Sequence, residues 1–313
     1  MNDSFILATR IIADSILGLC SLGIFGNVAA FYIFSRKKFK KTFFRTYFRS
    51  ICIVDTITFA YPINAFFLFQ YGLDTYNLNI FFCIYFEFII YVCPSISAWI
   101  LTMISFDRMV RIAFPTYFND LKKKLKLQYL YCIFVTLCSM VAYSPIFYYR
   151  EFNTYTDFDN QTNQTNSYNL CELKPGAGSI LWTDLGYANI VPALLMLIFN
   201  IKSISSLFRS RRVAAIGISK RDIRFAFTSF TLILAFFIFL IFSQLIYLFF
   251  AYGIFENDEE IMFWNTLACF VYTINYSLIF YLNMAANSTF RKEFISIIDQ
   301  NKSLFLSIYK QSY

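Results

Sequence analysis

Seven long apolar stretches constrain the fold of this 313-residue chain more than any other feature of its sequence. A helix of about 20 mostly apolar residues crosses the hydrocarbon core of a bilayer, and each stretch reaches that length. Only 15% of the residues are charged, against about 25% in soluble domains. The sequence therefore predicts an all-α bundle of seven transmembrane helices. The stretches span roughly residues 11–35, 47–70, 80–106, 128–149, 179–208, 225–252 and 261–286.

The distribution of basic residues predicts how these helices are oriented. With the N-terminus outside, the 27 Lys and Arg residues fall on the inner loops and tail, except for Arg10, Arg150 and Lys174. The positive-inside rule therefore predicts an extracellular N-terminus and a cytoplasmic C-terminus. The formal charge of +8 suits the anionic lipid of the inner leaflet. The expected partner is thus the lipid bilayer, and no nucleic acid is needed to explain the charge.

The sequence lacks the residues of most catalytic and metal sites. It has no histidine, which removes imidazole metal ligands and histidine general bases. Its eight cysteines include no Cys-x-x-Cys pair, so zinc and redox chemistry are not predicted. An intramembrane enzyme would also need a nucleophile, and no Gly-x-Ser-x-Gly elbow is present. We therefore expect no enzymatic activity.

An adjacent acid and arginine, Asp107 and Arg108, stand where the third apolar stretch gives way to basic sequence. Charges at the edge of a bilayer are costly and usually have a function. Together with residues at fixed distances from it, this pair resembles the rhodopsin-like G-protein-coupled receptors over nearly the whole chain, with Met109 in place of the motif's tyrosine. Those residues are Gly26, Asn27, Asp55, Cys83, Pro115, Pro145, Cys171 and Pro192.

The end of the last stretch, Asn275 to Asn283, is similar to peptide-receptor members of that superfamily, including invertebrate FMRFamide-type receptors. In such receptors a short amphipathic eighth helix follows, lying on the inner membrane surface. The implied organisation is an extracellular N-terminus (1–10), a seven-transmembrane receptor domain (11–286) and an amphipathic helix with a short cytoplasmic tail (287–313). The apolar stripe of the eighth helix comprises Phe290, Phe294, Ile297 and Ile298.

Several motifs of the superfamily are altered. Where Asn-Pro-x-x-Tyr is expected, the chain reads Ile279 to Asn283. The sixth stretch has no proline, and Phe242 and Ser243 stand at about the place of Cys-Trp-x-Pro. We expect this helix to be straighter than in relatives, because its usual kink-forming proline is missing.

The resemblance implies a disulfide bond between Cys83 and Cys171, which would attach the second outer loop to the third helix. It also implies that Arg108 is the pivot of the switch that a heterotrimeric G protein senses. Asp107 would be its local partner and Asp222 a second partner. Asp222 stands among basic residues, so an ordinary surface salt bridge is an open alternative.

Asp55, Ser97 and Asn275 occupy the positions that coordinate a sodium ion in the family. The matching asparagine of the last helix is Ile279, so one ligand is missing. A buried carboxylate needs a cation, a proton or several donors. A sodium ion and a protonated or hydrogen-bonded Asp55 are therefore equal alternatives.

Glu87, Tyr91 and Asp184 are the candidate ligand pocket, since they stand near the outer ends of the third and fifth helices. An acidic mouth attracts a basic ligand, which suggests a cationic neuropeptide. The alternatives are an acid that reaches the interface and solvated acidic loops. An opsin is not favoured, because residues 261–286 contain no lysine. An amine receptor is not favoured either, because Ile90 stands where its acid would be.

The leading interpretation is a plasma-membrane receptor that transduces an extracellular ligand, a peptide or another small ligand, into G-protein activation. A multi-span transporter or channel is the alternative, and it predicts intramembrane charges along a path and internal symmetry. Sequons at Asn160 and Asn163 lie on the predicted outer face, and we expect glycosylation there.

Overall fold

The computed structural model of the chain describes residues 3–39, 44–113, 121–159, 164–212, 230–231, 234–239, 241–246, 249 and 257–311. Within this part, six helical spans are long and apolar enough to cross a membrane, and Leu234–Ile246 is a shorter apolar helix. The six spans match six predicted stretches within a few residues. The remaining stretch, 225–252, is helical in the residues of it that are described. The predicted bundle architecture is therefore observed.

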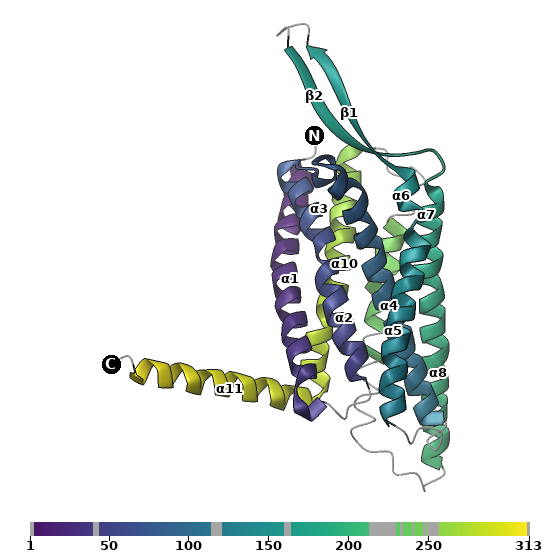
Figure 1. Cartoon of the computed structure of the whole chain (residues 1–313), viewed down its shortest axis with the longest axis vertical. Helices are drawn as coiled ribbons and strands as arrows, with labels where there is room; N and C mark the ends of the chain where they lie inside the picture. The colour runs from purple at the N-terminus through teal and green to yellow at the C-terminus, as the bar shows by residue number, and fades with distance from the viewer. Residues whose placement is uncertain are drawn as a thin grey trace.

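The helices run side by side along one axis, with the two termini near opposite ends of the bundle (Figure 1). The first span is α1 (Asp3–Ser35), so most of the predicted N-terminal segment continues this helix. The long elements that follow are α2 (Arg45–Thr58), α3 (Ala60–Tyr71), α4 (Glu87–Ala113), α5 (Leu121–Tyr143), α8 (Val191–Arg212) and α10 (Asp258–Ala286). The short elements are η1 (Lys37–Phe39), η2 (Thr75–Asn77), η3 (Phe81–Phe86), α6 (Ile146–Tyr149), α7 (Gly178–Thr183) and η5 (Asp184–Ile190).

Prolines explain where two spans depart from a regular α-helix. Pro62 has no N–H, so the carbonyl of Thr58, where α2 ends, lacks its usual helical donor. The second predicted stretch is accordingly two helices, α2 and α3, that meet at Phe59. The fifth span contains the π-helical segment η5 directly before Pro192. Such wide turns are rare and occur often at functional sites.

A β-hairpin stands above the end of the bundle at which the N-terminus lies (Figure 1). This end is predicted to face outward and is called the outer end below. Its strands β1 (Arg150–Asp159) and β2 (Gln164–Leu173) are antiparallel, with Phe152 opposite Cys171. This hairpin was not predicted, and the sequence of β1 carries no alternating pattern, because Phe152, Tyr155 and Phe158 recur at every third position and not at every second one. The predicted glycosylation sites, Asn160 and Asn163, fall between the strands and outside the described residues.

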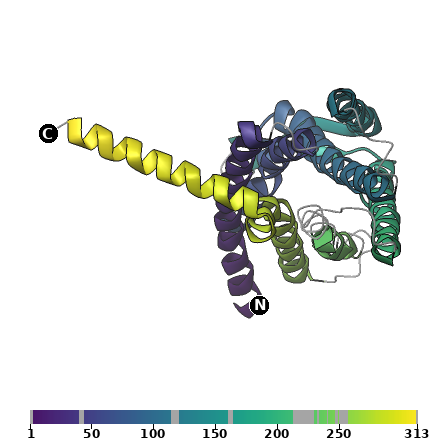
Figure 2. The same ribbon diagram turned by 90° about the horizontal axis from the view of Figure 1, so that it is seen from below.

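The last helix, α11 (Ser288–Gln311), leaves the opposite end of the bundle, which is predicted to face the cytoplasm and is called the inner end below, and extends away from it in both views (Figures 1 and 2). Its first turn is attached to the bundle by aromatic contacts: the ring of Phe290 lies 5.3 Å from Phe34 and 5.8 Å from Phe280. Glu293 forms ion pairs with Arg36 (2.9 Å) and Lys38 (2.6 Å). The start of the predicted apolar stripe therefore packs against protein. Ile298, further along, is exposed, as a membrane-facing residue would be.

Candidate functional site

The predicted switch residues lie at the inner end of α4. The side chains of Asp107 and Arg108 are both buried. The hydroxyl of Tyr47, on α2, hydrogen-bonds to the Asp107 carboxylate. Two guanidinium nitrogens of Arg108, Nε and Nη1, are buried without a hydrogen-bond partner in the part of the chain that the structure describes. The predicted second partner, Asp222, lies outside the described residues.

This geometry makes Arg108 an available donor. A buried cation without acceptors is unfavourable, and the guanidinium presents five N–H donors in a fixed planar array. An incoming carboxylate or carbonyl group would therefore be bound strongly, since charge-assisted hydrogen bonds are about twice as strong as neutral ones. The inner end of α4 thus suits the binding of a polar segment from a partner protein.

The structure brings the three predicted sodium-site residues together. Asp55, Ser97 and Asn275 line a cavity of about 10 Å³, whose wall also includes Ile279. Ser97 hydrogen-bonds to the Asp55 carboxylate. The other carboxylate oxygen, Oδ1, is buried and has no partner among the described residues. A cavity of this size is at the lower limit for one water molecule. The oxygens fit a single small ion or a proton, while Ile279 offers no ligand.

At the outer end, a disulfide bond joins Cys83 of η3 to Cys171 of β2 across 88 residues. The hairpin is held there by a second contact, because Arg150, the first residue of β1, forms an ion pair with Glu87 at the start of α4. The Glu87 side chain is only 7% exposed and that of Arg150 is 17% exposed. The predicted pocket acid Glu87 is therefore already neutralised by a cation of the chain itself.

Asp184, the second pocket acid, has a different environment. Its Oδ1 accepts a hydrogen bond from the hydroxyl of Tyr143 (2.9 Å). Its Oδ2 accepts from the amides of Asn189 (3.1 Å) and Gln244 (3.3 Å). All three donors are neutral, and Asp184 itself is partly exposed. Unlike Glu87, Asp184 is thus hydrogen-bonded by neutral groups only among the described residues.

Tyr91 connects the two acids. It lies one turn after Glu87 on α4, and its ring stacks on that of Tyr143 with centroids 5.6 Å apart. Tyr143 in turn donates to Asp184. The structure thus places Glu87, Tyr91 and Asp184 in one connected cluster at the outer end of the bundle.

Five residues of these clusters were missed by the sequence analysis: Tyr47, Tyr143, Arg150, Asn189 and Gln244. Tyr143 and Gln244 carry no motif, and their role depends on contacts between helices. Tyr47 likewise reaches Asp107 from another span. Arg150 did have a signal, because it is one of three basic residues on the predicted outer side. An arginine among the many acidic residues of that side could have been assigned as the partner of one of them.

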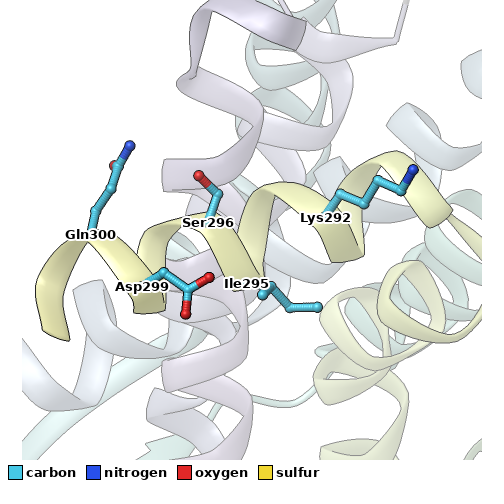
Figure 3. Close-up of a pocket in the computed structure, with 5 residues that line it drawn as sticks. All are labelled: Lys292, Ile295, Ser296, Asp299 and Gln300. Carbon is cyan, nitrogen blue, oxygen red and sulfur yellow. The ribbon is translucent and has the colours of Figure 1, made fainter. Parts of the chain in front are cut away.

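A separate hollow of about 410 Å³ lies along α11 at the inner end. Figure 3 shows that all of its lining side chains come from this one helix. Since Ile295 among them is half exposed, the hollow is an open surface and not an enclosed ligand cavity. The lining residues are Lys292, Ile295, Ser296, Asp299 and Gln300.

The apolar spans, the disulfide-bonded outer hairpin and the buried inner arginine together define a multi-pass membrane protein of the receptor class. The chain matches the family described as "7 transmembrane receptor (rhodopsin family)" over residues 26–288. It therefore belongs to the rhodopsin-family G-protein-coupled receptors. It is a receptor and not an enzyme, and the family match replaces the transporter or channel interpretation.

The chain is also similar to several curated receptors. It is 29% identical to the human N-arachidonyl glycine receptor over 126 residues, which are 40% of this chain and 37% of that receptor. It is 23% identical to the rat N-arachidonyl glycine receptor over 193 residues, which are 61% of this chain and 56% of that receptor. The matched region thus spans less than two thirds of each relative's length.

Proposed function

We propose that this chain is a plasma-membrane receptor, with its N-terminus outside and its C-terminus in the cytoplasm, that couples an extracellular cationic peptide to a heterotrimeric G protein. The observation that carries the coupling is the buried Arg108, whose Nε and Nη1 lack partners in the described part of the chain. A G protein would supply the acceptor for these groups. The ligand would shift a pre-existing equilibrium toward the state in which the inner end is open to that partner.

The ligand proposal rests on the contrast between the two outer acids. Glu87 is paired with Arg150, so it offers little net charge to a ligand. Asp184 is partly exposed and is hydrogen-bonded by neutral donors only among the described residues. An amine or guanidinium of a ligand would replace one neutral donor and form a charge-assisted hydrogen bond to the carboxylate. Asp184 is therefore the proposed anchor, and the hairpin above it would contact the rest of the peptide.

An acidic lipid is a second candidate ligand. The N-arachidonyl glycine receptors to which the chain is similar take their name from a long apolar chain that ends in a carboxylate. In this chain such a carboxylate would bind Arg150, where it would compete with Glu87. The two candidates make opposite predictions about which side chain is needed, Asp184 or Arg150.

The test is nucleotide exchange on a panel of G proteins in membranes that contain the chain. One arm uses peptides ending in Arg-Phe-amide, with citrulline in place of arginine as the uncharged control. The other arm uses N-acyl glycines. We expect the arginine peptides alone to stimulate exchange, and Asp184→Asn to reduce their potency about tenfold, as for the loss of a charged hydrogen-bond partner. Stimulation by N-acyl glycine that requires Arg150 would favour the lipid candidate.

Arg108→Ala tests the coupling itself. We expect it to abolish stimulated exchange, whereas Arg111→Ala, an exposed arginine one turn later on α4, should retain most of it. Unchanged stimulation in Arg108→Ala would contradict the proposed role of this residue. A well-expressed protein that activates no G protein with any ligand would contradict the receptor proposal for this chain.

Glycosylation tests the proposed orientation independently of any ligand. A shift in electrophoretic mobility on glycosidase treatment, lost when both Asn160 and Asn163 are changed to Gln, would place the hairpin outside the cell. An unshifted wild-type protein would leave the sequons unused and remove this support for the orientation.

A further inference from the structure

The carboxylate of Asp184 joins three parts of the outer bundle. Its donors are Tyr143 at the end of α5, Asn189 in η5 and Gln244 in the helix Leu234–Ile246. The first two belong to the fourth and fifth spans. Gln244 comes from the sixth, so its hydrogen bond to Asp184 ties the outer end of that helix to the fifth span.

The three donors are held with different strength. Tyr143 makes the shortest contact, at 2.9 Å, and its ring is fixed against Tyr91. The Asn189 amide donates twice, to the carboxylate at 3.1 Å and to the backbone carbonyl of Asp184 at 2.8 Å. Gln244 makes one contact with Asp184, at 3.3 Å, which is the longest of the set. It is also the donor whose side chain has the most rotatable bonds, so fixing it in place costs the most rotamer entropy.

A cationic ligand at Asp184 would therefore replace Gln244 before the other two donors. A charged donor forms a hydrogen bond to a carboxylate that is roughly twice as strong as that of a neutral amide. The ligand gains this difference by displacing the weakest neutral donor. Each carboxylate oxygen has two lone pairs, so Oδ1, which accepts from Tyr143 among the described residues, can accept a further donor, whereas Oδ2 already accepts from Asn189 and Gln244. A guanidinium that donates to both oxygens therefore needs the place of Gln244 on Oδ2, while Tyr143 and Asn189 can stay.

The opposite end of the same helix reaches the cavity around Asp55, a buried acid of the bundle. Phe236 is buried in the core and lines the cavity around Asp55. Phe236 and Gln244 are eight residues apart, a spacing that belongs to one stripe of a helix, and are separated by about 12 Å along its axis. One face of the helix thus contacts Asp184 at one end and the Asp55 cavity at the other.

We propose that Gln244 is the residue through which a cationic ligand at Asp184 releases the sixth helix. This inference rests on the proposed function for the ligand class, but the contact itself does not. Displacement of Gln244 breaks the tie between the sixth helix and the fifth span. Phe236 moves with the helix, so the wall of the Asp55 cavity changes when the ligand binds.

The experiment compares Gln244→Leu with wild type in lipid nanodiscs. Gln244→Leu removes the donor and keeps a side chain of similar size. Leu245→Ala is the matched control, since Leu245 is a neighbouring exposed residue on the same helix. Hydrogen–deuterium exchange of the amides of residues 234–246 reports release of the helix without any G protein. Basal nucleotide exchange on the G-protein panel is the second readout.

We expect Gln244→Leu to speed amide exchange over this helix by roughly tenfold to a hundredfold, the effect of losing one hydrogen bond to a charged group, and to raise basal nucleotide exchange in parallel. Leu245→Ala should do neither. A helix that is equally protected in Gln244→Leu and wild type overturns the inference. Faster amide exchange without nucleotide exchange on any G protein supports the tie at Gln244 and counts against the proposed receptor function instead.

The peptide ending in Arg-Phe-amide tests whether a cationic ligand releases the helix through Gln244. Bound to wild type, it should speed amide exchange of residues 234–246 to the level of Gln244→Leu, and it should add little in the variant, because both act on the same contact. The citrulline peptide should leave wild type unchanged. If the arginine peptide leaves the wild-type helix as protected as the citrulline peptide does, the role of the cation is overturned.

Discussion

The guanidinium of Arg150, at the start of the hairpin, lies against the carboxylate of Glu87, at the start of α4. Both side chains are largely shielded from water, and their charges compensate each other where the outer loop meets the bundle. This contact and the nearby disulfide bond, Cys83–Cys171, together set the position of the hairpin over the helices.

Removing one charge of this pair should destabilise the receptor more than removing both charges. Glu87→Gln leaves the Arg150 cation buried without its partner, and breaking a buried pair in this way costs about 3–5 kcal/mol. The double variant Glu87→Gln with Arg150→Gln has no unpaired charge, so we expect it to recover part of that loss. Thermal unfolding of the purified receptor in detergent measures both. A double variant less stable than Glu87→Gln would argue against a mutual pairing.

Tyr47→Phe should disturb the inner switch without touching Arg108. The substitution removes a hydrogen bond to the buried carboxylate of Asp107, and such a bond to a charged group contributes about 1.5–3 kcal/mol. We expect lower thermal stability and a severalfold change in basal nucleotide exchange. Tyr129→Phe, on an exposed position of α5, is the control. The prediction fails if the two variants cannot be distinguished in either assay.

Sodium should oppose activation if it occupies the cavity at Asp55. An ion bound there stabilises the arrangement in which the cavity exists. Replacing choline by sodium at constant ionic strength should therefore raise the agonist concentration for half-maximal exchange by roughly threefold to tenfold. Asp55→Asn should remove this dependence, because the amide carries no charge. Sodium sensitivity that persists in Asp55→Asn would show that the ion acts elsewhere and leave a proton on Asp55 as the better interpretation.

Two glycines of α1 should respond differently to the same change. A Cβ added at Gly23 would collide with the ring of Phe59 and with Ser277, where α1 approaches its neighbours closely. Overpacking of this kind costs typically about 1–3 kcal/mol. At Gly18 an added Cβ meets nothing within 4 Å. We expect Gly23→Ala to lower the midpoint of thermal unfolding and Gly18→Ala to leave it unchanged or raise it. Equal effects would contradict the close packing at Gly23.

The membrane spans were predictable because each is a local property of the sequence. About 20 apolar residues are required wherever a helix crosses a bilayer, and six spans were found in the described residues at their predicted places. The break between α2 and α3 was visible in principle, since Pro62 stands inside the second stretch. The register of Asp55, Ser97 and Asn275, taken from the resemblance, also brought the correct side chains to one cavity.

The partners of the outer acids could not be predicted in the same way. Glu87 and Arg150 are 63 residues apart in sequence, and the hairpin that carries Arg150 was expected as a loop. Asp184 and Gln244 are 60 residues apart. Such contacts depend on how helices rotate and pack, which apolar periodicity does not specify. The structure places both acids at one end of the bundle, whereas the pairing of Glu87 with Arg150 and the neutral donors of Asp184 could be found only in the structure.

The helix α11 gives the molecule a directional shape in the plane of the membrane. The ion pairs of Glu293 with Arg36 and Lys38 attach it to the chain directly after α1. From there it extends outward beyond the bundle (Figure 2). A neighbouring copy that approached on this side would meet α11 before it met the spans. We therefore expect close lateral pairing of two copies of this chain to occur at the other faces of the bundle.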